Sequence, residues 1–246
     1  AWSADPGAPQ SFRLRLGLGF FTADDWPIEG NSDDFLETEF ALAYTAHKYI
    51  EAWVGVHSSS NTNRGSQPQL LQTQGDVTFG LKGGAYVSDA VALGAGIGLH
   101  LLSGLGEGGF AGDGTSAEFR ALATFDLHRA KVAPVRIYFN YTYYVENSEA
   151  VYDSEPTEPD LIQEWGLQVA RYDRSIITLA LEGVIEPYVA PFLEYRIGTP
   201  HLVELERKGP GAEDFDFASV PHSINPGLRG FPTEDLGVEF VARIGL

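Results

Sequence analysis

The chain of 246 residues contains no cysteine and no methionine, and none of its apolar runs approaches the ~18 residues of a membrane-spanning helix. Without cysteine the protein has neither disulfides nor thiol chemistry. Basic residues are also scarce, because 16 lysines and arginines face 34 aspartates and glutamates and leave a formal net charge of −18. So few and so dispersed basic groups exclude a groove for the phosphates of a nucleic acid.

The first position also lacks methionine, and the chain opens with AWSADPGAPQ. This start predicts a mature terminus left by removal of a signal peptide, with an artificial start as the alternative.

Alternation of apolar and other residues is the dominant pattern that the sequence does contain. In residues 11–21, Phe12, Leu14, Leu16, Leu18 and Phe20 share one face of a strand, because successive side chains point to opposite faces. No Lys, Arg, Asp or Glu occupies the apolar register of this stretch or of the others like it. Those others are residues 36–44, 50–56, 77–87, 91–101, 117–127, 135–145, 165–169, 177–185 and 236–246.

A face without charge opposite a face that tolerates it is what lipid requires of a membrane-spanning barrel. We therefore predict an all-β protein: a transmembrane antiparallel β-barrel of about 12 strands, with 10 as the alternative and an even count expected. The barrel takes residues 11–246, after an N-terminal extension at residues 1–10. Pro191 and Pro226 make two of the last strands doubtful, since proline donates no ladder hydrogen bond.

The connections between these strands alternate between long and short. Residues 22–33, 58–74, 103–114 and 147–160 are long, while residues 46–48, 88–89, 128–133 and 171–174 are short turns. This asymmetry is typical of outer-membrane barrels. Residues 199–221 depart from it, because they form a long polar stretch where a short turn is expected. The alternative is a soluble barrel with the apolar register inward, but Gly94, Gly96 and Gly98 on the other register would make a poor soluble surface.

The last stretch, LGVEFVARIGL, carries apolar residues at Leu236, Val238, Phe240, Ala242, Ile244 and Leu246. It resembles the closing strand of outer-membrane proteins, although the final residue there is usually aromatic, so either the assembly signal is degenerate or the chain continues past Leu246. Residues 11–246 as a whole resemble small outer-membrane porin-like barrels, including the membrane domain of the outer-membrane protein A family, without a diagnostic motif. The resemblance implies the outer membrane of a Gram-negative cell and contact with its lipid. Nothing corresponds to the peptidoglycan-binding domain that often follows such barrels.

The register opposite the apolar one predicts the lining of the lumen. One reading is a porin-like channel for small solutes or ions, in which rings of charge set the preference. The other is an internal salt-bridge network that plugs the barrel, which would then be an anchoring element with other envelope proteins as partners. The predicted lumen-lining residues are Arg13, Arg15, Glu37, Glu39, Glu51, His57, Asp76, Lys82, His100, Glu118, Arg120, Arg136, Glu164, Glu182, Glu194, Arg196, Glu239 and Arg243.

A third reading is an outer-membrane hydrolase that uses His57 or His100 with a nearby serine, such as Ser103, and Glu118. No G-x-S-x-G elbow supports it, so we predict no enzyme and no catalytic residue. We also predict no cofactor and no metal, because the acidic loops at residues 22–34 and 149–160 lack the spacing of a calcium loop.

Overall fold

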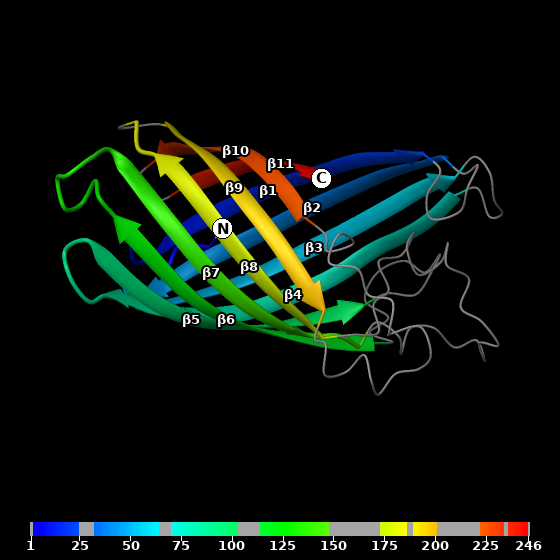
Figure 1. Cartoon of the computed structure of the whole chain (residues 1–246). Helices are drawn as coiled ribbons and strands as arrows, with labels where there is room; N and C mark the ends of the chain where they lie inside the picture. Colours follow the sequence, from blue (N-terminus) through cyan, green and yellow to red (C-terminus); the bar gives the residue numbers. More distant parts are fainter. Residues whose placement is uncertain are drawn as a thin grey trace.

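Eleven strands form a closed barrel in the computed structural model of the protein (Figure 1). The structure describes residues 2–24, 32–63, 70–102, 114–147, 173–185, 189–200, 222–233 and 236–245. The strands are β1 (Ser11–Asp24), β2 (Ser32–His47), β3 (Ile50–Asn63), β4 (Leu70–Tyr86), β5 (Val91–Leu102), β6 (Gly114–Asp126), β7 (Val135–Val145), β8 (Arg174–Gly183), β9 (Val189–Pro200), β10 (His222–Thr233) and β11 (Leu236–Gly245).

Each strand is hydrogen-bonded to its neighbours in chain order, and β1 closes the ring against β11. Consecutive strands pair antiparallel, whereas β1 and β11 pair parallel, from Phe12 opposite Leu236 to Gly19 opposite Arg243. Closure leaves none of these strands with an open edge. The all-β class and the barrel are therefore confirmed, with a strand count between the two predicted values.

The expectation of an even strand count is wrong for the described chain, which has eleven strands. With an odd number of strands, the first and the last pair parallel where the barrel closes. The predicted strand at residues 165–169 lies outside the described residues, and β7 and β8, which flank it in sequence, are directly paired. As a result β9 ends, and β10 begins, at the barrel end that carries the other long connections. The prediction that residues 199–221 stand where a short turn belongs is thus also wrong. So is the placement of Arg174 in a short turn, because Arg174 begins β8 at the end with the long connections.

Both doubtful strands belong to the wall. Pro191 in β9 lies opposite Leu228, and Pro226 in β10 lies opposite Leu193, with both proline residues exposed. The two prolines therefore sit within paired strands of a closed barrel, although each removes a backbone donor.

The two faces of the wall have opposite chemistry. Large apolar side chains are exposed on the outside, among them Leu18 at 62% and Phe40 at 50% of their full area, while Glu51 and Glu182 are completely buried. The alternative with the apolar register inward is thus wrong. The described residues include no helix of the length and apolarity needed to cross a membrane.

An arginine on the outer face should be tolerated in water but not in hydrocarbon. Leu179, in the middle of β8, is 46% exposed. We expect Leu179→Arg to lower the free energy of unfolding from lipid vesicles by about 2–4 kcal/mol, since a basic group at the bilayer midplane costs that much. Leu179→Ala is the control for lost packing. Equal stability of the two variants in vesicles would contradict a lipid-facing wall.

Candidate functional site: the filled interior

The candidate site is the interior of the barrel, where the charged register of the strands meets. All the predicted lumen-lining residues except Glu164, which lies outside the described residues, occupy strand positions that alternate with the exposed apolar ones. Within the wall most of them join ion pairs, in one long chain and several smaller groups.

The long chain of ion pairs links seven strands around the inside of the wall. Its centre is Glu182, which is completely buried and accepts hydrogen bonds from Arg136 at 3.1 Å, from Arg229, and from the hydroxyl of Tyr138 at 2.9 Å. Arg229 also binds Glu239, at 2.5 Å. In order, the members of the chain are Asp126, Arg136, Glu182, Arg229, Glu239, Arg15 and Glu39.

These pairs fill space as well as balancing charge. Arg229 lies 5.7 Å from the centre of the Phe192 ring, and the side chains of both residues are buried inside the barrel. A buried charge must be paired, because removing one member strands the other in a medium of low polarity. The chain therefore holds these side chains inside the barrel, linked from strand to strand along the inner face of the wall.

A second group lies where the barrel carries its short turns. Glu51 is completely buried and takes Arg13 and Lys82 as ion-pair partners, the latter at 3.0 Å. The ammonium of Lys82 also donates to the backbone carbonyl oxygens of Ser3 at 3.0 Å and Asp5 at 3.4 Å. This group thus joins three strands of the wall to the segment that precedes β1.

That preceding segment, Trp2–Pro6, lies inside the barrel. The chain turns back on itself at Gly7, whose φ of 99° favours glycine. From there Pro6 accepts a hydrogen bond from Thr45 at 2.8 Å, and the backbone amide of Ala4 donates to Thr124 at 2.9 Å. Ala4 and Pro6 are buried, and the N label in Figure 1 falls within the outline of the barrel.

The segment fills the space that glycines leave on the inner face of β4 and β5. A Cβ built on Gly84 would overlap the carbonyl oxygen of Ala4, and one on Gly94 would lie 3.2 Å from the same oxygen. Beyond it, Ala4 packs against Ala92 and Leu122. Main chain therefore occupies the interior beside Gly84 and Gly94, whereas the side chains of Glu118 and Trp53 lie beside Gly98.

Trp2 is clamped near the middle of the barrel. Its ring lies 5.2 Å from that of Trp53, and the guanidinium of Arg120 lies 4.2 Å from the Trp2 ring and 5.1 Å from the Trp53 ring. A guanidinium over an indole face is an attractive cation–π contact, worth about 0.5–2 kcal/mol according to its exposure. Trp53 and Arg120, the Trp2 clamp, therefore hold Trp2 against β3 and β6.

Two further groups lie toward the end with the long connections. Arg243 binds Glu37 at 2.5 Å, and Arg174 binds Glu146 at 2.6 Å. Arg196 belongs to the same end of the barrel, and within the described chain no ion pair joins it to another residue.

The histidines of the predicted hydrolase are not hydrogen-bonded to a serine there. His100 Nε2 lies 3.4 Å from Glu118 Oε1, and its ring lies 5.0 Å from that of Tyr144. Among the described residues, neither His100 nor His57 has a hydrogen bond to a serine, and Ser103 lies outside them. The structure thus supplies a histidine–carboxylate pair, and Ser116 lies opposite His100 in the β5–β6 ladder without a hydrogen bond between the two side chains in the described chain.

The described residues also hold no group of three or more side chains suited to a metal ion. Most of the acidic loop at residues 22–34, and all of that at residues 149–160, lie outside the described chain.

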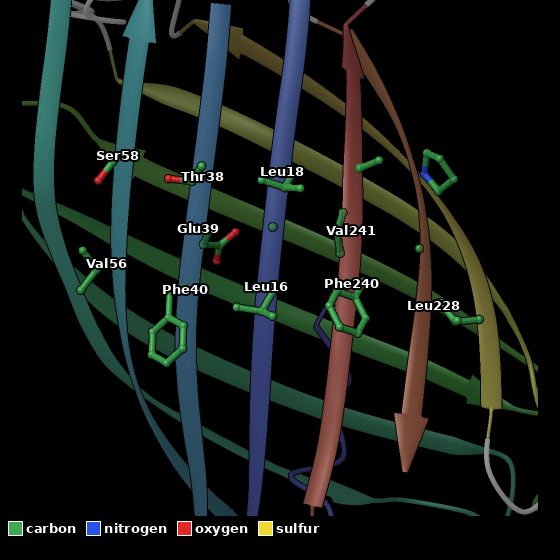
Figure 2. Close-up of a pocket in the computed structure, with 14 residues that line it drawn as sticks. Leu16, Leu18, Thr38, Glu39, Phe40, Val56, Ser58, Leu228, Phe240 and Val241 are labelled. Atoms are coloured by element: carbon green, nitrogen blue, oxygen red, sulfur yellow. The ribbon is translucent and has the colours of Figure 1, made fainter. Parts of the chain in front are cut away.

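A groove of about 830 Å³ crosses the outer face over β3, β2, β1, β11 and β10. Figure 2 shows Val56, Phe40, Leu16, Phe240 and Leu228 in one row across these strands. The lining is mostly apolar, with Thr38, Glu39 and Ser58 as its polar members, so it suits hydrocarbon.

Sequence reasoning placed the inward charges but missed the segment that lies among them. Residues 1–10 were set apart as an extension, whereas the structure lodges Trp2–Pro6 in the lumen. One signal was present: the inward register of β5 offers Ala92, Gly94, Gly96 and Gly98, which cannot fill the interior by themselves.

Neutralising the centre of the ion-pair chain should destabilise the fold. We expect Glu182→Gln to lower the free energy of unfolding by about 3 kcal/mol, because Arg136 and Arg229 lose a buried counter-charge. Urea unfolding of the folded protein measures this. Asp89→Asn, in an exposed turn, is the matched control and should change stability by less than about 0.5 kcal/mol. Similar values for both variants would show that the chain of ion pairs does not support the barrel.

A scan against models of known protein families finds no match for this chain, and a search of curated proteins finds none with significant similarity.

Proposed function

We propose that the chain spans the outer membrane of a Gram-negative bacterium as a barrel with a closed lumen, and that it serves there as a structural or anchoring element. One observation carries the proposal: two sets of groups occupy the interior, the ion-pair chain that includes Glu182 and the segment Trp2–Pro6. A continuous aqueous path is what a porin needs, so this filling supports the plugged barrel over the porin-like channel.

The outer surface supports placement in lipid. Large apolar side chains are exposed over the whole circumference, from Phe12 on β1 to Phe240 on β11, and the ionised groups of the strands lie on the other face. Monomeric soluble proteins rarely expose a continuous apolar surface of this extent. Membrane lipid is accordingly the first partner we propose for this chain.

The anchoring role follows from what a filled barrel can offer. Its wall is rigid and hydrogen-bonded all round, so segments at either end are held in fixed places relative to the membrane. Other envelope proteins are the proposed partners of those ends. The hydrolase stays a prediction without added support, because neither His57 nor His100 is paired with a serine in the described chain.

Conductance separates the closed barrel from the channel. The purified protein is reconstituted in a planar bilayer, and current is recorded across a salt gradient, with folding verified by the heat-modifiable shift on a gel. We expect folded protein to give no reproducible current steps, since the filled lumen offers ions no continuous path. Steps that recur with a defined conductance and ion preference would instead establish the porin-like channel.

A further inference from the structure

We propose that the inner face of β4 and β5 around Gly84 and Gly94 is a binding site for the main chain of a short peptide, and that Trp2–Pro6 is its resident ligand and the removable stopper of the lumen. The inference rests on the proposed closed barrel. It goes beyond that proposal because it says that the segment Trp2–Pro6, and not the ion-pair chain, can leave the interior.

The contacts that hold the segment are those of a receptor for main chain. Lys82 donates to the carbonyl oxygens of Ser3 and Asp5, Thr45 donates to that of Pro6, and Thr124 accepts from the amide of Ala4. All three side chains belong to the wall, and Lys82, Thr45 and Thr124 are themselves buried. These contacts recognise the carbonyl and amide groups of a segment that bends at Ala4 and Asp5, whatever its side chains are.

The shape of the site is equally specific to main chain. The Ala4 carbonyl lies against Gly84 and Gly94, where any side chain on the wall would collide with it. Glycine in the interior of a strand weakens it and often marks a place where another backbone approaches closely. Selectivity for a residue comes only at the far end, where Trp53 and Arg120 enclose Trp2.

The ion-pair chain and the segment fill different parts of the lumen. The chain runs from β6 through β7, β8, β10, β11 and β1 to β2, whereas the segment faces β3, β4, β5 and β6 and reaches β2 only at Thr45. Loss of the segment would leave the ion pairs intact and a gap beside the glycines. That gap would be lined by polar backbone and by Lys82 and Arg120, so water and ions would enter it.

Two adjacent glycines provide a matched pair of full-length variants. Gly84→Ala puts a methyl group where the Ala4 carbonyl lies, while Gly83→Ala puts one in ordinary contact, 3.7 Å from the carbonyl oxygen of Tyr49. In a planar bilayer we expect current steps from folded Gly84→Ala and silence from Gly83→Ala and from the unmodified protein. Silence from folded Gly84→Ala would count against the stopper.

A second experiment frees the segment without changing its site. Residues 7–10 are exposed, so a recognition sequence for a site-specific protease can be inserted between Ala8 and Pro9 of the full chain. After folding, cleavage and washing, with loss of the peptide verified by mass spectrometry, we expect conductance to appear. A synthetic peptide of residues 1–8 should block it again. For the same peptide with Trp2→Ala, the concentration that blocks half of the current should be about tenfold higher, since it loses the aromatic and cation–π contacts with Trp53 and Arg120.

The outcomes separate this inference from the proposed function. Conductance from the unmodified protein would overturn the closed barrel itself. A barrel that is folded, cleaved and free of peptide but still silent would overturn the removable stopper and leave the closed barrel standing. Equal block by the two peptides would overturn the site, because a merely obstructing peptide would not depend on the Trp2 clamp.

Discussion

Charge has only one side of this wall to occupy, and the ion pairs of the barrel follow from that constraint. Large apolar side chains face outward on every strand, and most arginines and carboxylates of the strands share one interior. There each must meet an opposite charge, because an unpaired ion in a poorly solvated space costs several kcal/mol. Glu182 satisfies two arginines at once, and Arg229 satisfies two carboxylates. Closure of the ring adds a further pair by bringing β1 beside β11, where Arg15 meets Glu239.

The same constraint explains why glycine is tolerated in the wall. A barrel of eleven strands encloses more space than one small side chain per position can fill. Where the inward positions carry Arg, Tyr or Phe, as on β7 to β10, the side chains reach across. Where they carry glycine, as on β4 and β5, a piece of main chain takes their place. The glycines at positions 84 and 94 and the main chain at Ala4 thus fit together, because the absence of side chains on the wall leaves the space that the segment occupies.

Alternation along the chain predicted most of this wall, because the period of a strand and the demand for an uncharged outer face are local properties of each stretch. The inward set from Arg13 to Arg243 followed directly. Three features did not follow. The pairing of β7 with β8 joins segments separated by 28 residues of sequence numbering, from Val145 to Asp173, and no local pattern encodes it. The parallel seam between β1 and β11 is a consequence of that pairing. The position of Ala4 depends on Gly84, Gly94 and Thr124. From the alternation of the sequence these three are recognisable only as small residues that face inward.

The ion-pair chain and the segment Trp2–Pro6 also differ in how they are attached to the barrel, and that difference decides which of them can leave the interior of the folded protein. The ion pairs belong to the strands and are lost only when the barrel unfolds. The segment joins β1 through the short exposed stretch at residues 7–10. A tether this short keeps the segment at a local concentration on the order of millimolar, so even micromolar affinity would seat it about a thousand times more often than not. A modest intrinsic affinity is therefore enough to keep the barrel closed, and loss of the tether alone would change the occupancy of the lumen without changing a single contact in the wall.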